Sequence, residues 1–105
     1  MNNINSLILE GTVSDTKVNE DTVNFTVDVS RFYKNSLGEN CEEVSTFDVV
    51  FPYRDYNKPL VYKITKGRKV RIVGRLHLNK WSVEGKENSK VDVLAEHIEF
   101  KPTVA

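Results

Sequence analysis

The sequence predicts an all-β domain, a five-stranded Greek-key barrel with one short helix between the third and fourth strands. Residues 22 to 30 alternate strictly between apolar and polar side chains, four further segments have strand-like composition, and the one helix signal lies between the third and fourth of them. A chain of 105 residues has room for one core. We therefore expect one domain over residues 1 to 100, followed by a frayed end over residues 101 to 105.

The first two predicted strands differ in their patterns. Residues 4 to 14 have the composition of a first strand, in which Gly11 suits a bulge or a tight bend. The second strand starts at Thr22 and buries one face, formed by Val23, Phe25, Val27 and Val29. Extending its alternation puts Phe32 on the polar, outward face, where the core does not need a large aromatic ring. In the alternative, the Phe32 ring folds over a strand end or packs into a subunit contact.

The third predicted strand follows a polar loop over residues 34 to 43 and spans residues 44 to 53. Alternation assigns Phe47 to the core, but a bulge in this strand would turn its ring outward. Pro52 has no backbone N–H to donate and indicates that regular pairing ends there. The sequence leaves both positions of the Phe47 ring open.

One short helix is predicted after the third strand. Asn57 and Pro59 have the composition of a helix start, and Gly67 has that of a helix stop. Five strands with a helix between the third and fourth are the order of an OB fold, a small barrel that binds oligonucleotides on its face and loops.

The last two predicted strands form a hairpin. In the fourth strand, aliphatic and polar residues alternate around Gly74, which indicates a close approach or a coil. Residues 83 to 88 form the tip of the hairpin. The last strand covers residues 90 to 100, and its pattern changes phase near residues 95 and 96, which predicts a bulge.

The formal net charge is zero, but the charges are unevenly distributed. Residues 54 to 81 contain nine Lys or Arg side chains and one acid, Asp55, whereas residues 1 to 53 contain three cations and nine acids. Such a block predicts a local positive surface, as expected for a protein that binds a polyanion. The alternative interpretation is an ordinary solvated face.

Several classes of function lack their signatures in this sequence. There is no nucleophile beside a base, no metal-ligand spacing and no phosphate-binding glycine loop, so we expect no catalysis, no metal and no cofactor. Cys41 is the single cysteine and has no intrachain disulfide partner. No apolar run approaches the ~20 residues that cross a bilayer, and the start lacks the pattern of a secretory signal. We therefore expect a cytoplasmic protein with no membrane contact.

The fourth strand combines cations with aromatic rings. Arg71, Arg75 and Lys80 interleave with His77 and Trp81 on a strand face whose opposite side is aliphatic. Single-stranded nucleic acids bind surfaces that offer cations for the phosphates and flat rings for the unpaired bases, with stacking worth ~1 to 3 kcal/mol per base. The strand therefore predicts a binding surface on which His77 contacts phosphate or a base. In the alternative, Trp81 only covers the edge of a neighbouring strand.

Fragments along nearly the whole chain, from Ile4 to Phe100, resemble the bacterial single-stranded DNA-binding proteins. These fragments are Asn5-Ser6-Leu7-Ile8-Leu9-Glu10-Gly11, Phe25-Thr26-Val27-Asp28-Val29-Ser30 with Phe32, Gly38-Glu39, and Lys66-Gly67-Arg68-Lys69-Val70-Arg71-Ile72-Val73-Gly74-Arg75-Leu76 followed by Lys80-Trp81. The resemblance implies an OB fold that assembles, usually as a homotetramer. It also implies binding of single-stranded DNA with little sequence preference, which protects the strand during DNA replication, recombination and repair.

The same resemblance implies roles for individual residues. Trp81 and Phe32 fall where the family places aromatic side chains that stack on bases. One alignment adds Phe47 and Tyr53 to them, whereas a shift by one residue gives those places to Thr46 and Pro52. The residues expected to contact phosphates or polar groups are Lys80, Arg75, Arg71, His77 and Lys34.

The resemblance also bears on partners. The first strand corresponds to the usual dimer contact of the family, and the run Leu7, Ile8 and Leu9 agrees because a strand buried on both faces loses its alternation. Family members commonly continue into a flexible linker and an acidic tip that recruits replication and repair proteins, whereas this chain ends at Ala105. It is then either the barrel alone or tail-less like primosomal replication protein N, which is usually dimeric and helps to reload the replicative helicase. An OB-fold adaptor of that kind, acting mainly through protein contacts, is the alternative function.

Overall fold

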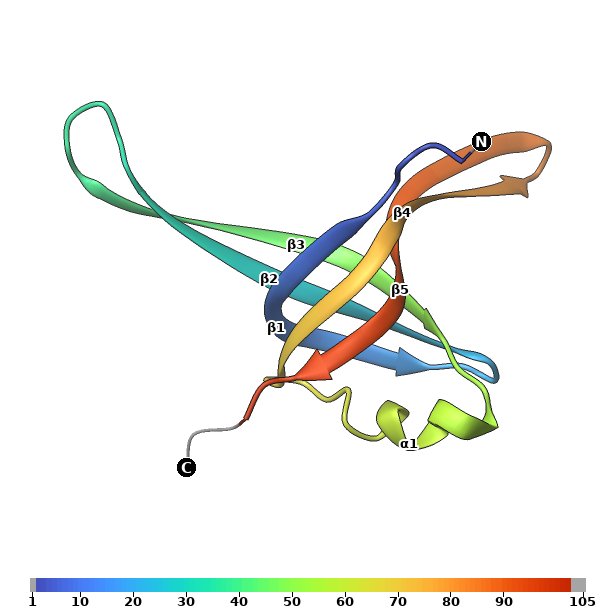
Figure 1. The fold of residues 1–105 in the computed structure, drawn as a ribbon. Helices are drawn as coiled ribbons and strands as arrows, with labels where there is room; N and C mark the ends of the chain where they lie inside the picture. Colours follow the sequence, from blue (N-terminus) through green and yellow to red (C-terminus); the bar gives the residue numbers. More distant parts are fainter. Residues whose placement is uncertain (1, 103–105) are drawn as a thin grey trace.

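The chain folds as a closed five-stranded barrel in the computed structural model, which describes residues 2 to 102 (Figure 1). The elements in chain order are β1 (Leu7–Val18), β2 (Thr22–Lys34), β3 (Asn40–Pro52), the 3-10 turn η1 (Asp55–Asn57), α1 (Lys58–Val61), β4 (Lys69–Val83) and β5 (Lys86–Phe100). The strands follow one another around the barrel in the order β1-β2-β3-β5-β4. This arrangement confirms the predicted five-stranded OB barrel with its helix between β3 and β4.

The barrel interior is filled mainly by β-branched side chains, which suit the pleated surface of strands. The predicted alternation of β2 is confirmed, because Val23, Phe25 and Val27 are each no more than 3% exposed. The other buried apolar residues are Val13, Val49, Phe51, Val61, Ile64, Val70, Ile72, Val93, Ala95 and Ile98. The core thus takes side chains from every strand and from the helical segment.

The barrel closes along a short parallel seam between β3 and β5. Only Val49 with Val93 and Val50 with Leu94 are in register there. The other four strand pairings, β1 with β2, β1 with β4, β2 with β3 and β4 with β5, are all antiparallel. This seam therefore has fewer paired residues than any of the other four strand pairings.

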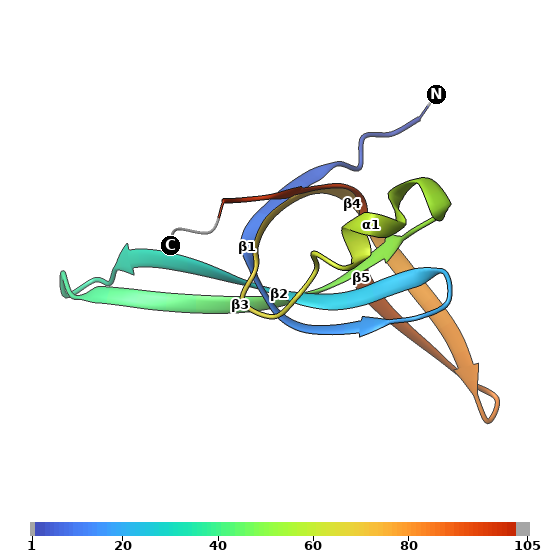
Figure 2. The same ribbon diagram turned by 90° about the horizontal axis from the view of Figure 1, so that it is seen from below.

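Two β-hairpins extend beyond the barrel as arms. The β2–β3 arm and the β4–β5 arm leave it on different sides (Figures 1 and 2). The β4–β5 arm turns in two residues, Glu84 at φ 50° and Gly85 at φ 78°, the backbone of a type I′ turn. The predicted loop over residues 83 to 88 is therefore too long, since β4 continues to Val83 and β5 starts at Lys86. Likewise, the polar residues 40 to 43 belong to β3 rather than to a loop.

The bulge in the first strand was predicted at the wrong residue. The pairing of β1 with β2 skips Ser14, three residues beyond Gly11. A Cβ atom at Gly11 would lie 2.3 Å from the carbonyl oxygen of Asp28, so this glycine permits close strand packing instead. The predicted bulge in β5 is confirmed, because Val73 pairs with His97 and the next residue of β4 pairs with Ala95.

The helical segment closes one end of the barrel. It is shorter than predicted, because α1 ends at Val61 and the chain then passes through turns to β4. Asn57 accepts a hydrogen bond from the backbone N–H of Arg54 through its Oδ1 atom, at 2.6 Å. Val61 and Ile64 are buried in the core, which explains why so short a helix is retained.

Among residues 2 to 102, no helix is both long and apolar enough to span a bilayer. Lys101, the first residue of the end predicted to fray, donates its backbone N–H to the carbonyl oxygen of Lys69 at 3.0 Å. The prediction for residues 103 to 105 lies outside the described residues.

Candidate nucleic-acid interface

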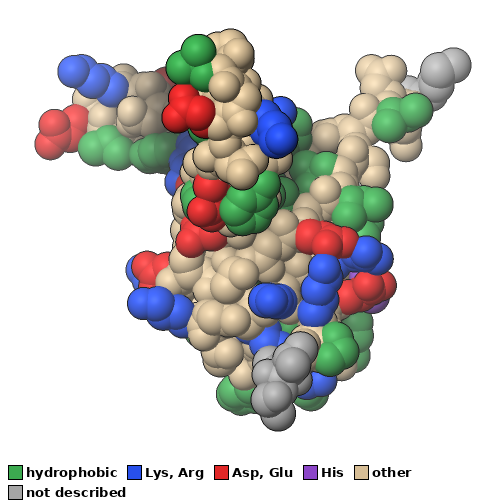
Figure 3. Space-filling view, turned by 90° about the vertical axis from the view of Figure 1, so that its left-hand side faces the viewer, with side chains coloured by type: hydrophobic (Ala, Val, Ile, Leu, Met, Phe, Trp, Pro, Cys, Tyr) green, Lys and Arg blue, Asp and Glu red, His purple; other side chains and the backbone are tan. Residues whose placement is uncertain are grey.

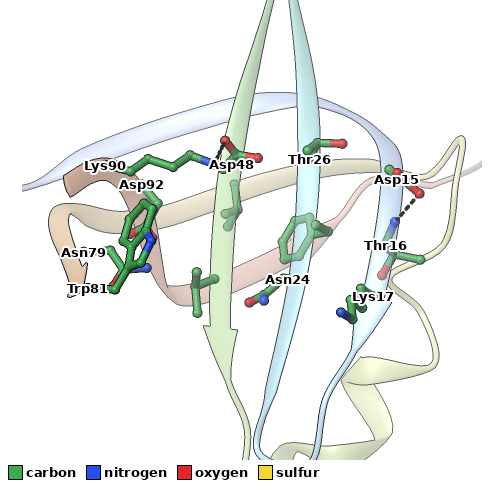
Figure 4. A pocket seen from close by; sticks show the side chains of 13 residues that line it. Asp15, Thr16, Lys17, Asn24, Thr26, Asp48, Asn79, Trp81, Lys90 and Asp92 are labelled. Carbon is green, nitrogen blue, oxygen red and sulfur yellow. Dashed lines mark hydrogen bonds and ion pairs between the residues drawn. The ribbon is translucent and has the colours of Figure 1, made fainter. Parts of the chain in front are cut away.

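A groove of about 490 Å³ runs across the outer face of β1, β2 and β3, beside the β4–β5 arm. Trp81 and Asn79 stand on one side of it and Asp15, Thr16 and Lys17 on the other (Figure 4). The groove is also lined by Asn24, Phe25, Thr26, Asp48, Val49, Val50, Lys90 and Asp92. Because these residues come from all five strands, the barrel itself positions the groove.

Trp81 presents its indole ring at the edge of the groove. It lies near the tip of the arm, opposite Asn88 on β5, and is 44% exposed. Since side chains alternate along a strand, His77, Asn79 and Trp81 share one face of the arm. The other face carries Leu76 and Leu78, which are 53% and 50% exposed.

An ion pair bridges the seam beside the groove. The ammonium group of Lys90 on β5 lies 2.5 Å from Oδ2 of Asp48 on β3. Both side chains are about half exposed. The pair therefore links the β4–β5 arm to β3 where backbone pairing between β3 and β5 is just beginning.

Asp92 and His77 form a second polar pair beneath the arm. Asp92 is the one buried charged residue of the described chain, at 6% exposure, and its Oδ1 lies 3.2 Å from Nδ1 of His77. Burying a carboxylate without a partner is costly. His77, predicted to contact phosphate or a base, thus stabilises a buried carboxylate in the structure.

Hydroxyl groups cover part of the outer sheet face. Asp28 accepts hydrogen bonds through Oδ1 from Thr46 at 2.7 Å and from Ser14 at 3.2 Å. The hydroxyls of Ser14 and Thr26 also lie 2.7 Å apart. This part of the face is consequently polar, and the Asp28 carboxylate is hydrogen-bonded.

The predicted aromatic residues of the β2–β3 arm point to opposite faces. Phe47 pairs with the buried Val27 and so lies on the same side as the core, but it is still 40% exposed because the barrel ends there. Phe32 pairs with Glu42, lies on the other face and is 76% exposed. Neither ring lines the groove of Trp81.

Tyr33 is an exposed ring that the sequence analysis missed. It shares the face of Phe47, is 38% exposed, and carries the Arg31 guanidinium 5.2 Å from its ring centroid. The sequence did indicate the position of this ring, because the alternation through Val27 and Val29 continues to residues 31 and 33 and places them on one face of β2.

Tyr53 is held more firmly than the other predicted stacking residues. Its hydroxyl lies 2.6 Å from the carbonyl oxygen of Asn19 and 2.8 Å from that of Glu20. The half-buried ring packs against the core and lines a smaller, mostly apolar cavity of about 300 Å³ with Val18 and Tyr62. Thr16 lines both this cavity and the groove, so the two are adjacent.

Arg71 and Lys80 do not lie beside His77 and Trp81, where the sequence pattern placed them. Lys80 follows the alternation of Leu76 and Leu78, on the opposite face of the arm from Trp81. Arg71 lies ten residues before Trp81 on β4, roughly 30 Å in an extended chain. Of the remaining predicted cations, Arg75 and Lys34 are exposed.

Arg71 belongs to an ion-pair network on the outer face of β1, β4 and β5. Its guanidinium lies 2.5 Å from Oε1 of Glu10 and 3.9 Å from Oε2 of Glu99, and Lys101 lies 2.6 Å from Glu10. Hydrogen bonds from Lys101 and Arg71 lower the pKa of Glu10, while the hydrogen bond to Glu10 raises the pKa of Arg71. This arginine is therefore engaged by carboxylates.

On the face drawn in Figure 3, the charged side chains do not form one positive patch. The face in Figure 3 shows Lys and Arg side chains interspersed with Asp and Glu. The cations of residues 54 to 81 are spread over the helical segment, the turns after it and β4. Within residues 2 to 102, no three His, Cys, Asp or Glu side chains gather as metal ligands would.

The three residues of β1 that were predicted to contact another subunit do not all point to the same side of the strand. Leu7 and Leu9 are half-buried and pack against the core. Ile8 points outward and is 69% exposed, and Ile4 before the strand is 96% exposed. Of the three predicted residues, Ile8 is thus the one whose side chain is exposed.

Comparisons with known proteins agree with the fold. The model of the single-strand binding protein family matches residues 4–101. The chain is 41% identical over 76 residues to the single-stranded DNA-binding protein of Aquifex aeolicus, covering 72% of this chain and 51% of that protein. It is 32% identical over 80 residues to that of Treponema pallidum, covering 76% and 44%. The chain therefore spans about half the length of the curated relatives it matches.

Solved structures share the barrel at lower identity. A Plasmodium falciparum single-stranded DNA-binding protein in complex with single-stranded DNA superposes with a TM-score of 0.77 at 21% identity, covering 97% of this chain and 98% of that one. A small single-stranded DNA-binding protein from Streptomyces coelicolor gives 0.69 at 23% identity, with 96% of each chain covered. These structures show the shared fold, and the family match over residues 4–101 shows that this chain belongs to the single-strand binding protein family.

Proposed function

We propose that this chain binds single-stranded DNA without requiring a particular base order and protects it during DNA replication, recombination and repair. The observation that carries the proposal is the half-exposed Trp81 indole at the edge of a groove on the outer face of the barrel. A ring in that position can stack on an unpaired base, whereas bases inside a duplex are already stacked and paired. Membership of the family and the names of its relatives support the proposal.

The strand would run between the two arms. In this proposal Trp81 stacks on bases in the groove, and the exposed rings of Phe32, Phe47 and Tyr33 stack on bases along the β2–β3 arm. Lys80, Arg75 and Lys34 would hold phosphates at the rim. Tyr53 would contribute through the adjacent apolar cavity. We leave Arg71 and His77 out of the contact set, because carboxylates already engage both.

We further propose that the chain acts as a homo-oligomer, a tetramer or a dimer, through the outward face of β1 around Ile8. Ile8 on β1 and Ile4 just before it are both exposed, and a subunit contact would remove their apolar surface from water. Replication and repair proteins are the expected protein partners. The alternative adaptor function is not favoured, since both curated relatives that match are single-stranded DNA-binding proteins.

The test is a titration that follows the fluorescence of Trp81, the single tryptophan. A mixed-sequence single strand should quench the emission strongly at low salt and less as salt rises, because phosphate contacts release counterions. The matching duplex should quench it little. Equal quenching by both, or none with the single strand, would reject the proposal.

A further inference from the structure

The helical end of the barrel, residues 54 to 69, is rich in cations that lie outside the groove of Trp81. It contains a single acid, Asp55, and six cations, which are Arg54, Lys58, Lys63, Lys66, Arg68 and Lys69. Among residues 2 to 102, none of these six side chains forms an ion pair. Their positive charge is therefore not neutralised by neighbouring carboxylates and is available to an anion.

Two of these cations lie over the same aromatic ring. The guanidinium carbon of Arg68 is 5.4 Å and the ammonium nitrogen of Lys63 is 5.9 Å from the centroid of the Phe100 ring. The Nε nitrogen of Arg68 is buried and has no hydrogen-bond partner among residues 2 to 102. Contact with a ring attracts a cation but leaves its charge in place. Two like charges near one ring, without a carboxylate, form a favourable place for a phosphate group.

A tight turn fixes the backbone of Arg68. Its N–H donates a hydrogen bond to the carbonyl oxygen of Thr65 at 3.0 Å, and Gly67 has φ 90° at the third position, the conformation of a type II turn. Val13 of β1 donates its N–H to the carbonyl oxygen of Arg68 at 2.9 Å and accepts a hydrogen bond from the N–H of Gly67 at 2.8 Å. Because the barrel anchors this turn, little backbone ordering is needed when a ligand binds.

A continuous surface connects the groove of Trp81 to this turn. Thr16 lines both the groove and the mostly apolar cavity beside it, and Thr65, the first residue of the turn, lines the same cavity. The helical segment lies below the end of β1 and supplies Tyr62 to the cavity (Figure 1). The Tyr62 ring is 74% exposed, and such a ring can stack on an unpaired base. A strand that leaves the groove past Thr16 thus meets first an aromatic ring and then the cations.

We propose that the helical end is a second contact surface for the same single strand that binds beside Trp81. A base stacks on Tyr62 there, and the phosphates are held by Lys63, Lys66 and Arg68. The proposal rests on the single-strand binding function proposed above, and it extends the path of the strand beyond the groove. Only a strand long enough to pass Thr16 reaches this surface. Stacking and phosphate contacts carry no base readout, so the second surface requires no base order.

Two lengths of (dT) oligonucleotide separate the two surfaces. About 6 nucleotides is near the short end of the range that one OB fold covers, and about 16 is its long end. Quenching of Trp81 reports occupancy of the groove by either strand. The double variant Lys63→Gln with Arg68→Gln should reduce the slope of log K against log salt concentration by about 1.4 for the long strand, since each lost phosphate contact removes about 0.7. The slope for the short strand should not change.

Tyr62→Ala tests the stacking ring by the same titrations. It should weaken binding of the long strand about fivefold or more, which corresponds to about 1 kcal/mol or more for a stacked base. Binding of the short strand should stay within about twofold of the native value, because the exposed ring lies outside the groove.

A matched control separates these effects from a general loss of positive charge. Lys69 has no ion pair either, but its side chain points away from the buried Val70 to the outer face of the barrel. Lys69→Gln should therefore leave the salt slope unchanged at both lengths. Thermal unfolding checks that each variant is folded, and Lys66→Gln, at an exposed turn position, replaces Arg68→Gln if the double variant unfolds. If the short strand binds too weakly to titrate, the comparison with Lys69→Gln on the long strand decides alone.

The outcomes distinguish this inference from the function on which it rests. An unchanged salt slope of the double variant with the long strand overturns the second surface, as does an equal loss with both lengths or with Lys69→Gln. In each of these cases quenching of Trp81 in the native protein leaves single-strand binding intact. If neither strand quenches Trp81 in the native protein, the proposed function itself fails and this inference falls with it.

Discussion

At the scale of single residues, the register of the two hairpins decides which side chains can act together. The sequence identified exposed rings at Trp81 and Phe32 from alternation alone, and both are exposed in the structure. It placed Lys80 on the wrong face of β4, because the charge of the side chain was given more weight than the strict alternation along the strand. It could not find the bonds of Tyr53 to the β1–β2 turn, since these link residues more than thirty positions apart.

Trp81→Ala should weaken the binding of a mixed-sequence single strand by ~1 to 3 kcal/mol, the contribution of one stacked base. The indole lines the groove and is only partly packed, so its removal should leave the barrel folded. Fluorescence anisotropy of a labelled oligonucleotide measures the change.

The matched control for this variant is Tyr56→Ala. Tyr56 is 83% exposed on η1, outside the groove, and its loss should leave the affinity within about twofold of the native value. If the two variants bind equally well, Trp81 does not stack on the strand.

At the scale of elements, alternation predicted the buried strands well and their ends poorly. The arms explain the difference, because both faces of β2, β3, β4 and β5 are exposed beyond the barrel and no apolar pattern marks where pairing stops. Residues 40 to 43 are polar yet paired for this reason. The bulge at Glu96 was predictable because it lies where β5 is still partly buried, and burial imposes a phase.

Gly74→Ala should destabilise the barrel by ~1 to 3 kcal/mol, as overpacking of a tight contact does. A Cβ atom at this position would lie 2.2 Å from the carbonyl oxygen of Leu94, and backbone atoms of β5 cannot move aside without disturbing the pairing. The midpoint of urea unfolding measures the loss. Gly38→Asn is the control, since φ there is 78° with no atom nearby and asparagine tolerates that conformation, so its midpoint should change little.

Glu10→Gln should lower stability at neutral pH by removing the acceptor shared by Arg71 and Lys101. Because these partners lower the pKa of Glu10 in the folded state below its usual 4.5, its contribution is present above that value. The contribution is lost as pH falls through the lowered folded-state pKa. The difference between variant and native protein should therefore shrink below pH 4.5 and disappear in stronger acid.

Urea unfolding midpoints of both proteins, taken from neutral pH to about pH 3, measure this dependence. Glu96→Gln, a carboxylate without an ion pair among the described residues, should show no such trend. A Glu10→Gln deficit that is equally large at both ends of the range would contradict the ionic origin.

At the scale of the whole molecule, the barrel provides a rigid support and the arms enlarge the surface. The arms share few core contacts, so their exposed apolar side chains are available to a ligand or a second subunit. The sequence could indicate assembly only through the apolar run of β1, because residues facing a partner and residues facing the core obey the same preference for burial.

Ile8→Glu should prevent self-association and yield a particle with the mass of one 12.0 kDa chain. A carboxylate at the centre of an apolar contact would be buried without a partner. Light scattering coupled to size exclusion measures the mass. Leu37→Glu, at an 81% exposed turn position of the β2–β3 arm, should leave it unchanged. A native protein that is already monomeric would contradict the proposed assembly.

The short seam between β3 and β5 has a consequence for how the barrel opens. If its two paired positions separate, the remaining pairings still connect the strands as one antiparallel sheet in the order β3-β2-β1-β4-β5. Local unfolding is cheapest where the fewest contacts are lost. We therefore expect the amide protons that bond across this seam to exchange with deuterium before those that bond across the antiparallel ladders, in which residues 49, 50, 93 and 94 also take part. We expect the seam to be the place where this barrel first opens into a sheet.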